Sequence, residues 1–266
     1  MAEEAYFSRD AAGRYLPAEL TRGPWDPNAQ HGGPPSALLG GIIERHERGS
    51  DPPRRVARMT LEILKPVPLA PLDVATRTVR GGRNVELIEA ELSAGGSPVM
   101  LARAWRIATA PLAPGTETIP PGPEIPAPEE LEPAEPFFPT GGRGYDRSVE
   151  FRFAAGAFLD PGPATVWTRC PRPIVDGEPL SPLERVLVVA DSGSGIGSAL
   201  RWDEWMFINV DVSVHLAREP AGEWVGMDAE TEVAGDGIGV TETRLFDERG
   251  LLGGGSQALL VRPRQG

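Results

Sequence analysis

Residues 180–200, LSPLERVLVVADSGSGIGSAL, decide the fold class of this chain. They predict an apolar helix that ends in a Gly-rich turn, because Leu183 and Leu187 lie four residues apart on one helical face. Asp191 comes four residues later and places a carboxylate at the end of this apolar stripe. Alternating segments follow: FINVDVSVHL at 207–216, GEWVGMDAETEV at 222–233 and GVTETRLFDERGLLGGGSQALLV at 239–261. A helix followed by antiparallel strands predicts an α+β unit.

The first hundred residues repeat this order of elements. GGPPSALLGGIIERHER at 32–48 predicts an apolar helix, and the segments at 58–66 and 72–107 predict strands and hairpins. An offset of 154 residues aligns Pro66 with Pro220, Ala75 with Ala229, Val79 with Val233, Gly81 with Gly235, Gly96 with Gly250 and Ala104 with Ala258. The order of elements and the turn glycines that recur in step together predict a duplicated unit.

The first helix is expected to be buried and wrapped by a sheet. It carries Leu38, Leu39, Ile42 and Ile43 on one face and Ala37, Gly40 and Gly41 on the other. Bulky apolar residues on one face and small residues opposite them are typical of a helix that packs on both sides.

A Pro-rich segment separates the two copies. Residues 111–139 contain ten prolines, a composition that favours extended segments and cannot build a packed core. We therefore predict an N-terminal unit at 1–110, a linker at 111–144 and a C-terminal unit at 145–266.

The composition limits the classes of partner. With 266 residues, 40% of them hydrophobic, the chain can form one large domain or two small fused ones. A net charge of -12 and a pI near 4.8 indicate neither a nucleic-acid-binding protein nor one that binds an anionic membrane. Cys170 is the only cysteine, so no internal disulfide forms, and no apolar signal segment or membrane span is evident. We expect a soluble cytoplasmic protein.

Two predicted strands carry polar side chains that are candidates for a functional site. The alternation at 208–216 predicts one face with Ile208, Val210, Val212, Val214 and Leu216 and another with Asn209, Asp211, Ser213 and His215. Gln257 shares its parity with Leu259 and Val261, so its amide is expected on an apolar face where it needs hydrogen-bonding partners.

An apolar helix with strands folding around it, present twice in one chain, resembles the double hotdog fold of the acyl-CoA thioesterase II-like group. The motifs VVADSGSGIGSAL, FINVDVSVHL followed by GEW, and DERGLLGGGSQALL carry the resemblance, which covers nearly the whole chain. It implies two fused units, each an antiparallel sheet around a long apolar helix. It also implies hydrolysis of acyl-CoA thioesters in fatty-acid metabolism.

The resemblance further implies three catalytic residues. Members of the group use an Asp at the end of the second helix, a Thr or similar polar residue on the next strand and a Gln on the last strand, which match Asp191, Asn209 and Gln257. Asp191 would be the general base, and the two amides would hold the attacking water. The chain departs from the pattern because Asn209 stands where a hydroxyl is common.

Substrate-binding residues are expected at the start of the first helix. Gly32 and Gly33 precede Pro34 and Pro35, and their backbone N–H groups could meet a thioester carbonyl at the positive helix end. His31 is adjacent and is expected to contact the ligand. Arginines that could meet the phosphates of coenzyme A are Arg54, Arg55, Arg58, Arg83 and Arg103, and no spacing singles one out.

The expected partners of the protein are its acyl-CoA substrate and further copies of the same chain. Coenzyme A would enter only as part of the acyl-CoA substrate, so no separate cofactor is expected. The three histidines His31, His46 and His215 have no zinc-site spacing, and no metal is expected. Open sheet edges or faces would allow homo-oligomers.

Other functions compete with this interpretation. Gly193, Gly195 and Gly197 could form a nucleotide-binding turn, but they give G-x-G-x-G, and the antiparallel pattern that follows lacks the parallel βαβ context. His31-Gly32-Gly33 is similar to an α/β-hydrolase oxyanion segment, yet G-x-S-x-G occurs nowhere. Within the hotdog fold, a hydratase would need an Asp and a His to converge on the substrate. A non-catalytic acyl-binding protein would keep the pocket without turnover.

Overall fold

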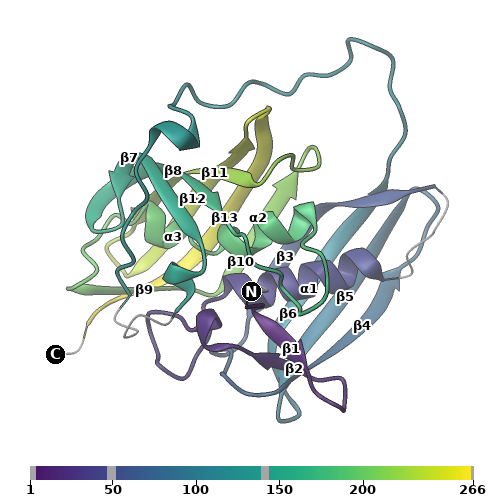
Figure 1. Ribbon diagram of the computed structural model, residues 1–266, viewed down its shortest axis with the longest axis horizontal. Helices are drawn as coiled ribbons and strands as arrows, with labels where there is room; N and C mark the ends of the chain where they lie inside the picture. The colour runs from purple at the N-terminus through teal and green to yellow at the C-terminus, as the bar shows by residue number, and fades with distance from the viewer. Residues whose placement is uncertain (1–3, 47–51, 139–143, 265–266) are drawn as a thin grey trace.

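In the computed structural model, which describes residues 4–46, 52–138 and 144–264, thirteen strands form one antiparallel sheet against which the helices pack (Figure 1). The N-terminal part comprises β1 (Phe7–Arg9), β2 (Tyr15–Pro17), η1 (Glu19–Thr21), α1 (Gly33–Arg45), β3 (Arg54–Ile63), β4 (Leu72–Arg80), β5 (Val85–Ala94) and β6 (Ser97–Ala108). The short 3-10 helices η2 (Pro128–Glu130) and η3 (Tyr145–Arg147) follow. The C-terminal part comprises β7 (Glu150–Ala157), β8 (Asp160–Arg169), α2 (Pro182–Ala190), α3 (Gly193–Ile196), β9 (Trp205–Asn209), β10 (Asp211–Leu216), β11 (Trp224–Val233), β12 (Ile238–Asp247) and β13 (Gly250–Pro263).

The strand order joins the two parts of the chain in the middle of the sheet. Neighbouring strands follow the order β1-β2-β4-β5-β6-β3-β10-β13-β12-β11-β8-β7, and β9 pairs with β13. The parts meet where β3 pairs with β10, with Thr60 opposite Ser213. The N-terminal end also reaches the other part, because Phe7 forms a bridge with Val175. The sheet is therefore continuous from one part of the chain to the other.

The two longer helices lie antiparallel against each other inside the sheet (Figure 1). Near the end of α1, an added Cβ at Gly40 would overlap the Leu187 side chain, and one at Gly41 would overlap the Glu184 carboxylate. Near the start of α1, Gly33 lies against the Val188 carbonyl. Glycines in α1 thus let α2 approach closely, which brings the C-terminal end of α2 to the N-terminal end of α1.

Helix α1 is buried as its composition predicts. Leu38, Leu39 and Ile43 are fully buried, and the small residues opposite them are also inside. Ile42 is only half-buried, so the apolar face does not point uniformly into the core.

The segment before Asp191 is a helix and not a strand. Ser181 caps α2 by accepting a hydrogen bond from the Glu184 N–H at 3.2 Å, and the Glu184 carboxylate accepts from the Ser181 N–H at 2.7 Å. The helix ends at Ala190, and the short helix α3 begins at Gly193. A strand leading into a Gly-rich nucleotide-binding loop is therefore excluded for this segment.

A β-bulge interrupts the predicted strand at 208–216. Asn209 pairs with Leu259, and Ser213 pairs with Ser256. Four residue steps along β9 and β10 therefore match only three steps along β13, which is the pattern of a β-bulge. Val210 is 50% exposed, whereas Val212 is buried. The prediction of one uninterrupted alternation is wrong here, because the extra residue reverses the facing of the side chains before it.

The Pro-rich segment packs against the C-terminal part of the sheet. It runs as a long arch after β6 (Figure 1), but then the Trp167 indole donates to the Pro126 carbonyl at 3.0 Å. The Ala134 N–H donates to the Phe151 carbonyl at 2.7 Å, and Leu131 packs against a buried aromatic cluster. The prediction that these residues contribute to no packed core is wrong for the second half of the segment.

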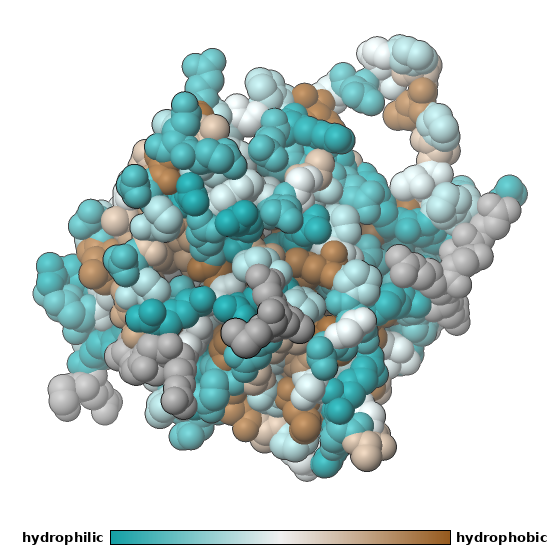
Figure 2. Space-filling view, in the orientation of Figure 1, coloured by the Kyte–Doolittle hydropathy of each residue, from teal (hydrophilic) through white to brown (hydrophobic). Residues whose placement is uncertain are grey.

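The face in Figure 2 is mainly hydrophilic, with apolar residues in small groups, in keeping with the acidic composition. None of the helices in the described part of the chain has the length and apolarity needed to cross a lipid bilayer.

Candidate active site

A cavity of about 450 Å³ opens beside the junction of α1 and α2. His31, Gly32, Asp191 and Asn209 line it, so the structure brings together predicted site residues from distant parts of the sequence. Gly33 and Gln257 do not line the cavity and lie directly behind these residues.

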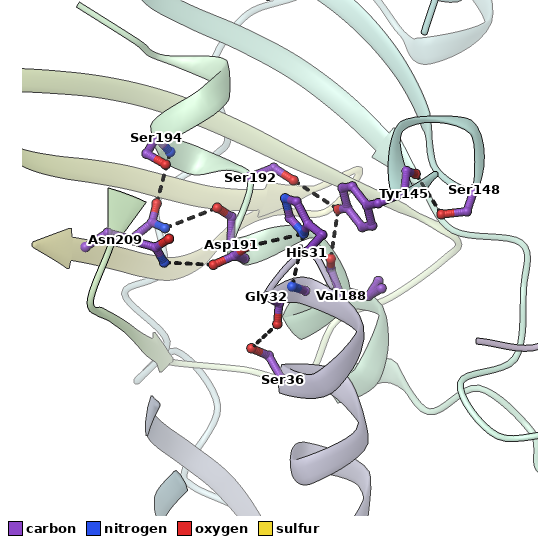
Figure 3. Close-up of polar contacts among 12 residues, drawn as sticks. His31, Gly32, Ser36, Tyr145, Ser148, Val188, Asp191, Ser192, Ser194 and Asn209 are labelled. Carbon is purple, nitrogen blue, oxygen red and sulfur yellow. Dashed lines mark hydrogen bonds and ion pairs between the residues drawn. The ribbon is translucent and has the colours of Figure 1, made fainter. Parts of the chain in front are cut away.

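Asp191 follows the last residue of α2, and its two carboxylate oxygens face Asn209 and His31 (Figure 3). The Asn209 amide donates to Oδ1 at 2.8 Å, and Oδ2 lies 3.2 Å from His31 Nδ1. The side chain is 6% exposed. The carboxylate is thus fixed in one orientation at the cavity wall and does not hydrogen-bond to its own turn.

The β-bulge explains how Asn209 reaches Asp191. Sequence alternation places Asn209 with Asp211 and Ser213, but Asn209 instead shares the inward side of β9 with buried Phe207. Its amide also donates to the Asp211 carbonyl at 3.2 Å, which fixes its rotamer.

Gln257 braces the turn behind the carboxylate. It is 2% exposed and shares its face with buried Leu259 and Val261, which confirms the predicted parity. Its amide nitrogen donates to the Asp191 main-chain carbonyl at 3.1 Å, and its oxygen accepts from the Ser194 N–H at 3.0 Å. Both polar atoms therefore bind backbone, and this geometry differs from the expected contact with water.

His31 faces Asp191 as a neutral imidazole. Burial lowers the pKa of His31, and the nearby Asp191 carboxylate only partly opposes this shift. Nδ1 accepts a hydrogen bond from the Gly33 N–H at 3.0 Å, so the ring proton belongs on Nε2. The lone pair of Nδ1, which the Gly33 N–H already engages, therefore lies beside the Asp191 carboxylate, and the contact between Nδ1 and Oδ2 is not an ion pair at neutral pH.

Tyr145 fixes the His31 ring and was not identified from the sequence. The two rings stack with centroids 3.7 Å apart and planes 2° apart. The Tyr145 hydroxyl donates to the Val188 carbonyl at 2.8 Å and lies 2.9 Å from Ser192 Oγ. Burial raises the pKa of Tyr145 well above its usual value, so it remains a neutral phenol. No motif distinguishes this tyrosine, because its neighbours come from remote segments.

The start of α1 leaves one backbone N–H without a hydrogen bond among the described residues. The Gly33 N–H is occupied by His31, and Pro34 and Pro35 have no N–H. Within the described residues no hydrogen bond uses the Gly32 N–H, and Gly32 lines the cavity. An added Cβ at Gly32 would lie 2.7 Å from Asp191 Oδ1, so only glycine lets the helix terminus approach the carboxylate.

The arginines considered for coenzyme A do not line the cavity. Arg103 is paired with Glu89 at 2.6 Å, and Arg55 donates to the Leu216 carbonyl at 3.0 Å. The cationic side chain that lines the cavity is Lys65, the only lysine in the sequence.

Within residues 4–46, 52–138 and 144–264, no group of three or more His, Cys, Asp or Glu side chains is arranged to hold a metal ion. His46 contacts Thr76 and Thr78, and His215 is exposed on β10.

The arrangement suits acid–base chemistry on a carbonyl compound. A fixed carboxylate can take a proton from a water molecule in the cavity, and a free backbone N–H at a helix N-terminus can stabilise negative charge nearby. Asp191 and Gly32 both line the cavity.

Known proteins share this organisation. Residues 21–107 match the model of the acyl-CoA thioesterase N-terminal domain, and residues 126–261 match that of the acyl-CoA thioesterase C-terminal domain. A comparison with curated protein sequences gave no match.

Solved structures superpose on nearly the whole chain. A candidate thioesterase from Novosphingobium aromaticivorans has a TM-score of 0.74 at 21% identity, with 97% of this chain and 99% of that chain covered. A hotdog protein from Alicyclobacillus acidocaldarius gives 0.72 at 15%, covering 96% and 92%. A tesB protein from Mycobacterium avium subs paratuberculosis gives 0.67 at 17%, covering 97% and 96%. The fold is a hotdog fold, and since its two domains match in order, the chain belongs to the acyl-CoA thioesterase family and is a thioester hydrolase.

Proposed function

We propose that this protein hydrolyses acyl-CoA thioesters to the free acid and coenzyme A, with Asp191 as the base that activates water. The observation that best supports this proposal is the position of the Asp191 carboxylate, which Asn209 holds at the cavity wall beside the N-terminus of α1. The hydrogen bond from Asn209 stabilises the ionised carboxylate, the form that accepts a proton.

His31 supports the proton transfer in this proposal. When the carboxylate takes a proton from water on Oδ2, the O–H lies 3.2 Å from His31 Nδ1 and can share its lone pair with the Gly33 N–H. The neutral imidazole therefore stabilises the protonated acid, which forms only as water attacks. Stacking on Tyr145 keeps the ring in place for this contact.

The thioester carbonyl is expected at the Gly32 N–H. As the water oxygen bonds to the carbonyl carbon, the carbonyl oxygen becomes negative, and a donor at the positive end of α1 stabilises it. Collapse of this intermediate breaks the carbon–sulfur bond, and the proton held by Asp191 passes to the departing sulfur. The products are the acid and the thiol, and the carboxylate is regenerated.

The coenzyme A portion would leave the cavity past Lys65. This side chain is exposed where it lines the cavity, so it can meet a phosphate without the cost of burying its charge. Coenzyme A takes part only as a portion of the substrate, and the proposed steps use no other cofactor.

The proposed architecture is two fused hotdog units with the site between them. Shifting β4, β5 and β6 by 154 residues places them on β11, β12 and β13, with ends that differ by one or two residues. The proposed units are residues 1–110 and 145–266, joined by 111–144. The site draws His31 and Gly32 from the first unit and Asp191 and Asn209 from the second.

A hydratase is the second candidate, because the structure brings a histidine and an aspartate into contact. A hydratase would direct both groups at the α and β carbons of an enoyl thioester. Here, however, His31 Nδ1 is directed at Asp191 and Gly33. Loss of enoyl-CoA absorbance without thiol release would favour this candidate over hydrolysis.

The test is thiol release from a panel of acyl-CoAs by the wild-type protein and by Asp191→Asn. We expect turnover by the wild type and a kcat lower by about 10²- to 10⁴-fold in the variant, because the amide cannot accept the proton. Calorimetric titration with a substrate analogue shows whether the variant still binds. Binding without turnover by the wild type would instead indicate an acyl-binding protein. An unaffected variant would exclude Asp191 as the base.

A further inference from the structure

Aromatic side chains gather on one side of the cavity, beyond the polar residues. Eight of the seventeen aromatic residues in the sequence line this cavity. We define six of them as the aromatic box: Trp25, Phe137, Phe138, Phe158, Trp202 and Phe207.

Trp202 is the centre of the box. Its ring stacks on Trp25 with centroids 4.8 Å apart and planes 9° apart. Phe207 meets it edge-on at 4.7 Å and Phe137 edge-on at 5.1 Å. Gly195 lies beneath it, where an added Cβ would be 3.1 Å from Trp202 Cζ2. The rings therefore hold one another in fixed offset and edge-to-face arrangements.

The box begins close to the proposed base. The His31 ring, in contact with Asp191, lies 6.3 Å from the Phe138 ring between centroids. Phe138 in turn lies 6.3 Å from Trp202. A group bound in the box is thus only a few bonds from a thioester carbonyl placed at the polar residues.

Resting on the proposed hydrolysis, we propose that the preferred acyl group carries an aromatic ring a few bonds from the thioester carbonyl. A flat ring can meet the faces and edges of the box rings together, whereas a straight alkyl chain makes only apolar contacts. Aromatic pairs contribute about two- to tenfold in affinity beyond apolar burial. A ring also loses fewer rotatable bonds on binding than an alkyl chain of equal carbon count.

The test compares phenylacetyl-CoA, cyclohexylacetyl-CoA and octanoyl-CoA, whose acyl groups have the same number of carbons. In each, a methylene separates the carbonyl from the rest of the acyl group, so intrinsic thioester reactivity is similar. We expect kcat/KM to be about tenfold higher for phenylacetyl-CoA than for octanoyl-CoA. It should also exceed that for cyclohexylacetyl-CoA, which has the width of a ring without an aromatic face.

Trp202→Leu tests the box directly, because leucine keeps an apolar side chain and removes the ring. The variant should lower the ratio of kcat/KM for phenylacetyl-CoA to kcat/KM for octanoyl-CoA by about tenfold. Urea unfolding of the variant checks that it is folded. Trp105→Leu is the matched control, since Trp105 is also partly buried but lies outside the cavity, and it should leave the ratio unchanged.

The outcomes separate this inference from the proposed function. Equal or higher kcat/KM for octanoyl-CoA, or equal values for the two ring substrates, would overturn the inference while leaving hydrolysis intact. An unchanged ratio in Trp202→Leu would also overturn it. If the wild type released thiol from none of the three substrates, the proposed function itself would fail.

Discussion

The two ends of the cavity are held together by different forces. At the polar end, Asp191, Asn209 and Gln257 are joined by directed hydrogen bonds of 2.8 and 3.1 Å. In the aromatic box, Trp25 and Trp202 are held by ring contacts that have no donor or acceptor. The comparison indicates that the polar end fixes one geometry for chemistry, whereas the box tolerates adjustment and selects ligands by shape.

Apart from Phe207, which shares β9 with Asn209, the two ends also differ in the elements that carry them. The polar end is built at the ends of α1 and α2 and on β9, which the core holds. In the box, Trp25 comes from the segment before α1, Phe158 from the β7–β8 turn and Trp202 from the turn before β9. Substitutions in these loops can therefore change selectivity without disturbing the proposed base.

Among substitutions at the polar end, Gly32→Ala should lower kcat the most after substitution of Asp191 itself. The Gly32 backbone is helical, with φ of -66°, so alanine causes no strain, but its Cβ would lie 2.7 Å from Asp191 Oδ1. Displacement of the carboxylate should lower kcat about 100-fold for every substrate in a thiol-release assay.

The control for this variant is Gly235→Ala, since an added Cβ there meets nothing within 4 Å. It should retain wild-type activity. If Gly32→Ala were as active as this control, the close approach of the helix terminus to Asp191 would have no catalytic importance.

Asn209→Ala should have a smaller effect on the same end. It removes the 2.8 Å hydrogen bond to Asp191 Oδ1, and loss of one bond to a charged group should lower kcat about tenfold. Asn209→Thr should recover part of the loss if the hydroxyl reaches the carboxylate. A rate for Asn209→Ala equal to the wild type would mean that Asn209 does not orient the base.

The smallest expected effect concerns stability. Burial lowers the folded-state pKa of His31 below its ordinary value of 6.5, so the unfolded chain binds more protons as pH falls below that value. Part of the free energy of unfolding is therefore lost between about pH 6.5 and the lower folded-state pKa. Asp191, in contact with the ring, reduces this loss.

Urea unfolding at about pH 7.5 and about pH 5.5 measures this effect. His31→Phe keeps a ring against Tyr145 but cannot titrate, so it should lose less stability on acidification than the wild type. His215→Phe, at an exposed position, should behave like the wild type. The same loss in His31→Phe as in the wild type would show that His31 is not held neutral by the fold.

Much of the polar end could be predicted from the sequence because its residues have local signatures. Asp191 ends an apolar helical stripe, and Gln257 shares the parity of Leu259 and Val261. Gly32 opens a helix whose next residues include Pro34. The pattern of a single helix or strand is enough to predict where each of these side chains lies on its element. The fold then brings the elements together.

The remainder depends on contacts that no local pattern encodes. The β-bulge at Val210 turns Asn209 inward, and an insertion in one strand is visible only against the register of its partner. Phe137 lies in a Pro-rich segment whose composition indicated a linker. Most aromatic residues of the box lie on loops, which have no regular repeat from which the facing of a side chain could be predicted. The box therefore becomes evident only from the structure.

The most direct test of this division of roles is kcat/KM for phenylacetyl-CoA and octanoyl-CoA in the wild type, Asp191→Asn and Trp202→Leu. We predict that Asp191→Asn lowers both values by a similar factor of at least about 100 and leaves their ratio unchanged. Trp202→Leu should lower the ratio about tenfold while octanoyl-CoA turnover persists. The account would be contradicted if Asp191→Asn kept wild-type rates, or if the ratio changed in Asp191→Asn and stayed constant in Trp202→Leu.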